Sequence, residues 1–293
     1  MNTRARLLAI PALALAGVST RITSSITAIA QATPDAFSNN ILHLTVERDG
    51  VNGMPESLAA GRYTVHISSP VPAREDGIGV LFAVLPEGIT PQQAFEDVQN
   101  ADPFPEWFHQ AHFGGGVNLQ YNASQASGVI DLSPGSWIVT SLGARTPGVT
   151  FEVTGEFPSD SPVPDVHASI ELDEMSITMK PAELPPGDIV IEVCNTGDQI
   201  HHLSFVRVPG NTTRENVQAL WDSYLGGTPD ANALSEDDTT EIAYFAEISP
   251  GVCQWGELML KPGTYVLSCF VGDPNMGGMP HAFMGMWDLI VIP

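Results

Sequence analysis

The chain of 293 residues repeats itself at the length of a whole domain. The segment GRYTVHISS at residues 61–69 is matched by GDIVIEVCN at 187–195, and VLFAVLP at 80–86 is matched by LSFVRVP at 203–209. The closest match comes last, with DLSPGSWIVTS at 131–141 against MLKPGTYVLSC at 259–269. A repeat of about 120 residues indicates a duplicated domain rather than a unit of a solenoid.

The repeated segments are typical of β-strands, because they are rich in Val, Ile and Thr and are bounded by turn residues. A Pro-Gly pair between two such runs in each copy predicts a tight hairpin turn. A helical stretch is expected in each copy, beginning near Thr90 and Thr212 as N-caps, with Pro91 in the first helical position. We therefore expect an all-β fold of two Greek-key β-sandwich domains, each with a short inserted helix.

The repeat also predicts how the chain is divided. We expect an export signal or N-terminal anchor at 1–32, a first domain at 40–155, a linker at 156–164 and a second domain at 165–293. The first segment has a basic start, an apolar stretch at 7–18 and small residues at Ala30 and Ala32, as export signals do. The protein is therefore expected in the periplasm, at the cell surface or in the medium, with no membrane contact beyond that anchor.

The formal net charge of −23 at pH 7 restricts the partners. Nucleic acid and anionic membranes carry the same sign of charge and are excluded as partners. A cationic protein or metal ions remain compatible with this charge.

The two copies differ where chemistry is expected. Ser141 stands where the second copy has Cys269, and Ile78 stands opposite His201. The second copy also inserts residues 271–286, which end in PHAFMGM at 280–286 and contain His281. A purely structural repeat has no reason to collect Cys, His and Met in one copy. A thiolate, two imidazoles and a weak axial thioether are the ligand set that suits copper in electron transfer.

The same residues resemble the cupredoxins, the plastocyanin-like blue copper family. GTYVLSC at 263–269 is similar to that family's Gly-x-Tyr-x-x-x-Cys strand, and PHAFMGM matches its Pro-His-x4-Met ending. NTGDQIHHLSF at 195–205 is similar to the segment that carries the first ligand. The resemblance covers residues 165–293, and it extends to the first copy only as a degenerate relative. It implies one type 1 copper ion with four ligands: His201, Cys269, His281 and Met286.

Two departures from the family pattern bear on this ligand set. Eleven residues separate Cys269 from His281, more than in small cupredoxins, although copper nitrite reductases of the same superfamily also have a longer loop here. His202 stands where the family often has Asn, so it either replaces the hydrogen bond of that Asn or is itself the ligand. Asn195 and Met284 are the other residues that we expect to support or replace a ligand.

The cysteine count is odd, which leaves one of three cysteines without a partner in an exported protein. If Cys269 binds the metal, Cys194 and Cys253 remain either to form a disulfide or to stay reduced.

We expect a one-electron carrier that works with a redox partner protein or a copper donor. The sequence shows no HExxH motif, no Gly-x-Ser-x-Gly elbow and none of the His-x-His pairs of multicopper oxidases, so no enzyme is expected. Phe283, Met284 and Trp287 are expected to form a docking patch around an exposed His281, as the resemblance suggests.

Two alternatives remain open. The first is a copper carrier or resistance protein without electron transfer, in which methionines of the long loop, such as Met276 and Met279, add ligands for Cu(I). The second is a metal-free cupredoxin-like interaction protein.

Overall fold

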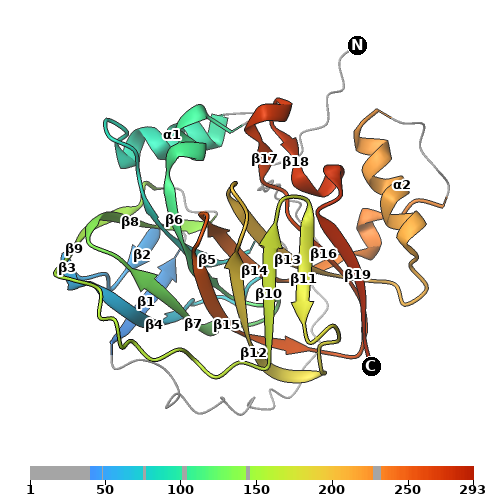
Figure 1. Cartoon of the computed structure of the whole chain (residues 1–293), viewed down its shortest axis with the longest axis horizontal. Coiled ribbons are helices and arrows are strands. Elements are labelled where there is room, and N and C mark those ends of the chain that lie inside the picture. Colours follow the sequence, from blue (N-terminus) through green and yellow to red (C-terminus); the bar gives the residue numbers. More distant parts are fainter. Residues whose placement is uncertain (1–39, 48, 75–76, 101–103, 143–145, 227–231) are drawn as a thin grey trace.

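The computed structural model describes residues 40–47, 49–74, 77–100, 104–142, 146–226 and 232–293. Two large sheets pack face to face, and the two helices lie at the edges of this sandwich (Figure 1). The all-β prediction is confirmed. The predicted export signal at 1–32 lies outside the described residues. Among the described residues, no helix has the length and apolar character needed to cross a membrane.

The N-terminal half contributes nine strands and one α-helix: β1 Ile41–Glu47, β2 Gly50–Asn52, β3 Ser57–Ala59, β4 Gly61–Ser68, β5 Gly79–Val84, α1 Pro91–Asn100, β6 His112–Asn118, β7 Gln125–Leu132, β8 Gly135–Leu142 and β9 Val149–Thr154. A 3-10 helix, η2 Glu106–Gln110, precedes β6. The side chains alternate as in a half-buried sheet. In β1, Leu42 and Leu44 point into the core while His43 between them is exposed.

The C-terminal half contributes ten strands and one α-helix: β10 Ala168–Asp173, β11 Ser176–Lys180, β12 Gly187–Asn195, β13 His201–Val208, α2 Arg214–Tyr224, β14 Thr240–Ile248, β15 Cys253–Leu260, β16 Gly263–Ser268, β17 Gly272–Asp273, β18 Met279–Pro280 and β19 Trp287–Ile292. Its 3-10 helices are η3 Glu236–Asp238, η4 Pro274–Met276 and η5 His281–Met284. The stretch between β9 and β10 contains neither helix nor strand.

Both large sheets continue through the two halves. The first has the strand order β11-β10-β12-β15-β7-β4-β1-β2 and the second has the order β19-β16-β13-β14-β6-β5-β8-β9-β3. The halves meet where β15 pairs with β7 and where β14 pairs with β6. Gly128 and Gly256 face each other at the first junction, and a Cβ on Gly128 would lie 2.9 Å from the carbonyl oxygen of Trp255. The close approach of the two halves therefore requires glycine there.

The internal repeat is also a repeat of strand register. Leu81 in β5 pairs with Thr140 in β8, just as Ser204 in β13 pairs with Ser268 in β16. The pairing of β5 with β6 slips after Phe82, and the pairing of β13 with β14 slips at the matching place, after Phe205. Two halves that share a bulge at the same position have the same backbone design.

The predicted Pro-Gly hairpins are wrong. The strands before and after each Pro-Gly pair, β7 and β8 in one half and β15 and β16 in the other, belong to different sheets. Each pair turns the chain from one layer of the sandwich to the other. An aromatic side chain just after the pair fixes this corner, since Trp137 Nε1 donates to Ser133 O at 2.8 Å and Tyr265 Oη donates to Lys261 O at 2.7 Å.

The two predicted helices are present, and one of the two caps differs from the prediction. Thr90 lies just before α1 and its hydroxyl accepts the N–H of Gln93 at 3.1 Å, as expected. The cap of α2 is Thr213 rather than Thr212. Thr213 and Asn216 bond each other's backbone N–H groups in a capping box, which only the side chain at the capping position can complete.

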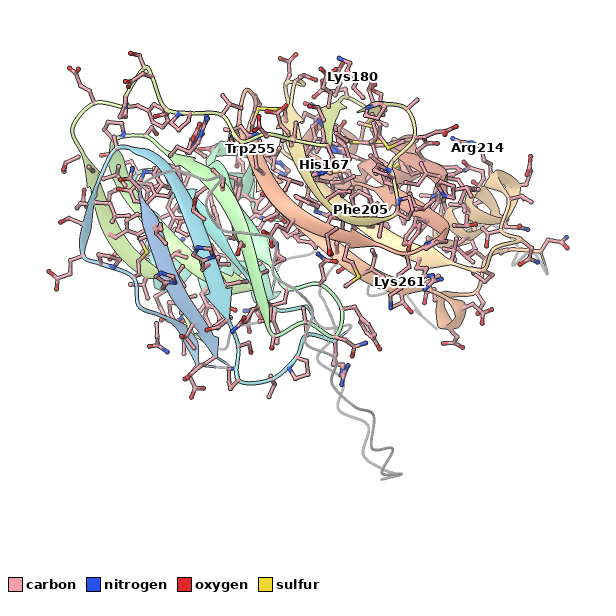
Figure 2. All side chains as sticks on the ribbon, turned by 90° about the horizontal axis from the view of Figure 1, so that it is seen from below. His167, Lys180, Phe205, Arg214, Trp255 and Lys261 are labelled. Atoms are coloured by element: carbon pink, nitrogen blue, oxygen red, sulfur yellow. A yellow bond between two sulfur atoms is a disulfide. The ribbon has the colours of Figure 1, made fainter. Side chains whose placement is uncertain are left out.

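Three buried clusters fill the molecule. The N-terminal half has a core of its own around Phe82, Trp137 and Phe151. The core of the C-terminal half surrounds Phe205, which is fully buried between the layers (Figure 2). That second core also contains Phe108, from η2 of the N-terminal half. A third cluster lies under α2, where the helix covers the outer face of β13, β16 and β19.

Candidate metal centre

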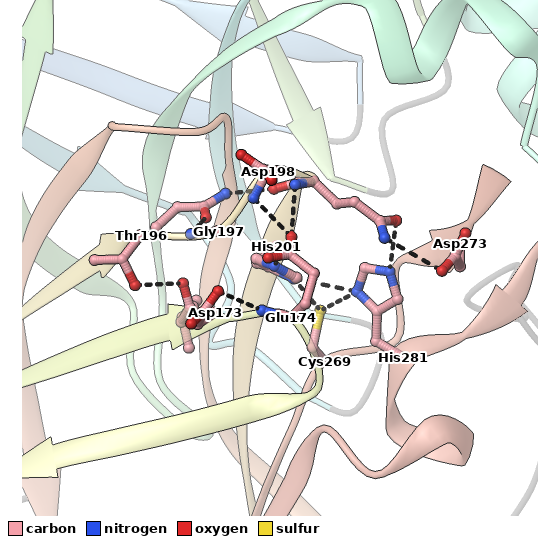
Figure 3. A network of polar contacts seen from close by, with 12 residues as sticks. Asp173, Glu174, Thr196, Gly197, Asp198, His201, Cys269, Asp273 and His281 are labelled. Atoms are coloured by element: carbon pink, nitrogen blue, oxygen red, sulfur yellow. Dashed lines mark hydrogen bonds and ion pairs between the residues drawn. The ribbon is translucent and has the colours of Figure 1, made fainter. Parts of the chain in front are cut away.

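Three donor atoms from distant parts of the chain come together inside the C-terminal half (Figure 3). His201 Nδ1 and His281 Nδ1 lie 3.1 Å apart, and Cys269 Sγ lies 3.8 Å and 3.6 Å from them respectively. All three side chains are fully buried. Among the described residues, no other group of three His, Cys or carboxylate side chains has its donor atoms this close, except for one that contains the disulfide cysteines.

The local backbone explains why these residues meet. His201 begins β13, and Cys269 follows the last residue of β16, the strand that pairs with β13. The loop with His281 returns to Cys269 through three backbone hydrogen bonds: Cys269 N–H to Met286 O at 3.2 Å, Ala282 N–H to Cys269 O at 2.7 Å and Met286 N–H to His281 O at 2.9 Å. Met286, whose backbone makes two of these bonds, is fully buried. The sandwich itself therefore brings three of the four predicted ligands together.

The hydrogen bonds of His281 determine which of its ring nitrogens is free. Gln199 Nε2 donates to Asp273 Oδ2 at 3.2 Å, so Gln199 Oε1 faces His281 Nε2, also at 3.2 Å. An amide oxygen only accepts, so His281 carries its proton on Nε2. His201 Nε2 lies 3.5 Å from Glu174 Oε1. Among the described residues it has no hydrogen-bond partner. His281 thus presents a bare Nδ1 to the sulfur, and His201 Nδ1 lies within hydrogen-bond distance of that nitrogen.

This geometry fits a metal ion. Bonds of roughly 2.0–2.3 Å at tetrahedral or trigonal angles place the donors of one ion roughly 3.3–3.8 Å apart, close to the separations found here. The lone pair of His281 Nδ1 faces the other two donor atoms, so a cation between the three can bind it. The combination of one thiolate and two imidazoles suits copper or zinc. The residues present therefore fit the copper ion that the cupredoxin resemblance implies.

Burial governs the protonation of the site. It raises the pKa of the Cys269 thiol to about 12, even though the backbone N–H groups of His202 and Val271 oppose the shift. Burial also lowers the pKa of His281 to about 4, helped by the nearby His201, and it lowers the pKa of His201 against the pull of Glu174. Two neutral imidazoles are therefore ready to bind, whereas the sulfur binds as a thiolate only when a metal displaces its proton.

Asn195 and His202 support the ligands rather than facing the donor atoms. Asn195 Nδ2 donates to Gln199 O at 2.6 Å and to Ile248 O at 2.8 Å, which holds the loop before His201 in place. His202 donates its backbone N–H to Cys269 Sγ at 3.4 Å, while its ring bonds elsewhere. Met284 is half-buried in η5. The choice of His201 over His202 as ligand stays a prediction, and it is supported by this placement.

Cys194 and Cys253 form a disulfide in the structure. They are register partners on β12 and β15, and Cys194 directly precedes Asn195 along the chain. The bridge therefore lies at the base of the loop that leads to His201.

Sequence reasoning missed three residues of the site. Gln199 and Asp273 fix the proton of His281, and Glu174 accepts the N–H groups of Asp198 and Gln199 at 2.7 Å and 2.8 Å. The only signal for Gln199 is its position two residues before His201. Glu174 lies in a turn and Asp273 ends β17, and neither belongs to a motif, so only the fold brings them here.

The expectation of an exposed His281 is wrong. The inserted loop folds back on itself, with Gly272 of β17 paired to Pro280 of β18, and His281 N–H donates to Val271 O at 2.9 Å. Val271 and Phe108 belong to the same buried cluster, which extends from the inserted loop into η2 of the N-terminal half. The length of the loop, which the sequence leaves unexplained, is what encloses the ring.

Comparison with known proteins gives similarity to solved structures only. No known family model matches the chain, and no curated protein matches it. Reduced auracyanin from the photosynthetic bacterium Roseiflexus castenholzii is 23% identical over 43% of this chain and 94% of its own, with a TM-score of 0.28. Auracyanin A from Chloroflexus aurantiacus, described as a "blue" copper protein, is 21% identical over 43% and 98%, with a TM-score of 0.27.

Copper nitrite reductase from Nitrosomonas europaea is 10% identical over 86% of this chain and 93% of its own, with a TM-score of 0.24. The structures that this chain resembles thus include both enzymes and auracyanins. The chain is similar to cupredoxin-containing proteins, and the assignment of a metal rests on the donor atoms of this chain.

Proposed function

We propose that the protein is an exported one-electron carrier with one type 1 copper ion, held by His201, Cys269 and His281 with Met286 as a weak axial ligand. The observation that carries the proposal is the convergence of two imidazole nitrogens and one thiol sulfur within 3.8 Å of one another in a fully buried site. The first half of the chain lacks these side chains at the matching positions, which supports a specific role for them.

Bound copper supplies the exchange of one electron between Cu(II) and Cu(I). The chain supplies a fixed set of donors that suits both oxidation states, because imidazole binds either ion and the sulfur ligands favour Cu(I). The buried walls exclude water, and the hydrogen bonds of Gln199, Glu174 and Asn195 hold the ligand loops in place. Little therefore has to move when the charge changes.

The partner is proposed to be a basic redox protein that docks beside α2. Because His281 is buried, the electron leaves through the rings that neighbour the ligands. Phe270 follows Cys269 and lies 5.4 Å from Trp221 in α2, centroid to centroid, and Phe283 lies 5.5 Å from Tyr224. Exposed acidic residues surround this cluster: Glu215, Asp222, Glu236, Asp237 and Asp238. Their charge favours a cationic partner.

A second candidate is a copper carrier that receives and passes on Cu(I). The observation that favours it is the exposure of Met276, whose side chain is 55% exposed in the loop that covers the site. Thioether sulfur is a soft ligand that prefers Cu(I). A Cu(I) affinity far above that for Cu(II), without a reversible voltammetric wave, distinguishes the carrier from the electron-transfer protein.

The decisive experiment is the visible and EPR spectrum of the protein after loading with one equivalent of Cu(II). The proposal expects an intense blue or green band with narrowed copper hyperfine splitting, because a copper–thiolate bond produces both. A pale spectrum with ordinary splitting, or no stoichiometric copper, contradicts the proposal and favours a metal-free interaction protein.

A further inference from the structure

A chain of polar side chains leads from the Cys269 loop to strand β14, apart from the ligands themselves. The Phe270 N–H donates to His202 Nε2 at 2.8 Å. His202 Nδ1 lies 2.9 Å from Tyr244 Oη, and Tyr244 Oη donates to Glu247 Oε1 at 2.8 Å. His202 and Glu247 are both buried, so water does not compete freely for these bonds.

The first of these hydrogen bonds determines which group donates and which accepts in each of the others. A backbone N–H only donates, so His202 Nε2 must accept and carries no proton. The neutral imidazole then has its proton on Nδ1 and donates it to the Tyr244 oxygen. The Tyr244 hydroxyl is left to donate to Glu247. The ring of His202 is therefore held in one tautomer and one orientation by two residues that touch none of the proposed ligands' donor atoms.

His202 connects these hydrogen bonds to the Cys269 sulfur. Its backbone N–H points at Cys269 Sγ at 3.4 Å, and its ring holds the peptide that follows Cys269. A single residue thus contacts both the sulfur of Cys269 and the peptide that follows it. Groups that orient a ligand in this way are known to affect metal affinity and redox behaviour strongly.

The N-terminal half provides an internal reference for this arrangement. Gly79 occupies the position of His202, since it lies two residues before the Leu81 that matches Ser204. Gly116 pairs with Leu81 as Tyr244 pairs with Ser204. The half without ligands thus has glycine at both places, so the shared backbone does not require the His202–Tyr244 contact.

We propose that Glu247 and Tyr244 are positioning residues that act through His202 to fix the Cys269 thiolate for the metal. The inference rests on the proposed copper function. It adds to that function a buried Glu–Tyr–His chain in place of the single Asn that the cupredoxin resemblance leads one to expect.

The test compares Tyr244→Phe and Glu247→Leu with the control Tyr63→Phe. Tyr63 also has a buried ring whose hydroxyl makes one hydrogen bond, to Ala59 O at 2.7 Å, but it lies in the core of the other half. Glu247→Gln keeps an acceptor for the Tyr244 hydroxyl and serves as the conservative rescue. The pair Glu247→Leu and Glu247→Gln keeps the test informative if Tyr244→Phe does not fold.

The first measurement is made without copper, by NMR of the histidine ring nitrogens and by hydrogen exchange of the Phe270 amide. We expect the wild-type protein and Tyr63→Phe to show His202 protonated on Nδ1 with a protected Phe270 amide. Tyr244→Phe and Glu247→Leu should give mixed tautomers and amide exchange about tenfold faster. Unchanged tautomer and protection in both variants would overturn the proposal.

The second measurement is made on the copper-loaded proteins. Disturbing the support of a metal ligand costs about 10- to 100-fold in affinity. We expect Tyr244→Phe and Glu247→Leu to lose about tenfold in Cu(II) affinity and to change the hyperfine splitting, whereas Glu247→Gln stays within about threefold of wild type. Wild-type affinity and splitting in both disruptive variants would also overturn the proposal. If the wild-type protein binds no copper, the proposed function fails, and the copper-free measurement still decides the role of Tyr244 and Glu247.

Discussion

The two halves of this molecule have the same backbone design but differ in chemistry. Their strands pair in the same register, bulge at the same position and turn between layers at the same Pro-Gly pairs. Yet at matching positions the N-terminal half has Ile78, Gly79, Gly116 and Ser141 where the C-terminal half has His201, His202, Tyr244 and Cys269. A handful of side chains and one inserted loop therefore separate a structural copy from a candidate metal centre.

The halves also differ in how far each depends on the other. The N-terminal core around Phe82 and Phe151 is formed by that half alone. The C-terminal core takes in Phe108 and Phe113 of the N-terminal half. The half that carries the candidate site is thus the one whose core extends into its neighbour.

Replacing Cys269 with Ser makes the C-terminal half resemble the N-terminal half at this position, and it has the largest expected effect. The hydroxyl does not form a copper–thiolate bond, so the intense visible band should disappear. The Cu(II) affinity should fall by more than about 100-fold, the upper range for losing only a supporting residue. Absorption spectra and competition titrations measure both, and retention of the band would refute Cys269 as a ligand.

The reverse substitution is the matched control. Ser141→Cys places a thiol at the corresponding position of β8, where neither the inserted loop nor a partner imidazole at position 78 is present. We expect no second copper equivalent and no new band. A new band in Ser141→Cys would mean that the shared backbone alone creates the site.

Phe108→Ala tests how far the C-terminal half depends on its neighbour. Removing a buried phenylalanine costs about 3–5 kcal/mol of unfolding free energy. Because Phe108 belongs to the same buried cluster as Cys269 and Met286, the variant should also loosen the copper site. Denaturant unfolding gives the stability, and the EPR spectrum reports on the site.

Phe151→Ala is the companion variant, since Phe151 lies in the separate N-terminal core. We expect a similar loss of stability with an unchanged EPR spectrum of the folded protein. Equal spectral changes in the two variants would show that the two cores are not distinct in their effect on the site.

Glu241 in β14 makes the stability of the fold depend on pH. The N-terminal half has no carboxyl at the matching position. Glu241 pairs with Val206 as Phe113 pairs with Ala83, so a carboxyl stands where the other half has a core phenylalanine. Burial raises the pKa of Glu241 to about 7, above its usual value of 4.5. The folded state therefore favours the protonated carboxyl. This contribution to stability is fully present below pH 4.5 and is lost as the pH rises through about 7.

Glu241→Gln should remove this dependence. The difference in unfolding free energy between variant and wild type should grow by an amount on the order of 1–3 kcal/mol from pH 4.5 to pH 8, in favour of the variant. Urea unfolding at several pH values measures it, with the exposed Glu236→Gln as the control for a simple loss of charge. A difference that does not change with pH would contradict the assignment.

Much of this comparison could be predicted, because the amino-acid sequence alone shows the repeat and shows Ser141 at the position that matches Cys269. The corner role of the Pro-Gly pairs could not, since a local turn signal does not say whether the next strand pairs with the previous one or joins the opposite sheet. The burial of His281 could not be predicted either, because it depends on how the inserted loop folds back on itself. Glu174, Asp273 and Glu247 reach the site through the fold alone.

The smallest expected effect sharpens the comparison of the two helices. Thr213→Ala removes the hydroxyl that accepts the Asn216 N–H at 3.3 Å, and the loss of such a cap costs about 1 kcal/mol. Thr212→Ala makes the same chemical change one residue earlier, outside the capping box, and should stay within about 0.5 kcal/mol of wild type. Urea unfolding of the two variants measures the difference. A larger loss for Thr212→Ala would return the cap to the residue predicted from the sequence. A larger loss for Thr213→Ala would mean that α2, which covers the rings of Phe270 and Phe283 beside the proposed ligands, begins one residue later than predicted, at the same spacing from Pro209 as α1 has from Pro86.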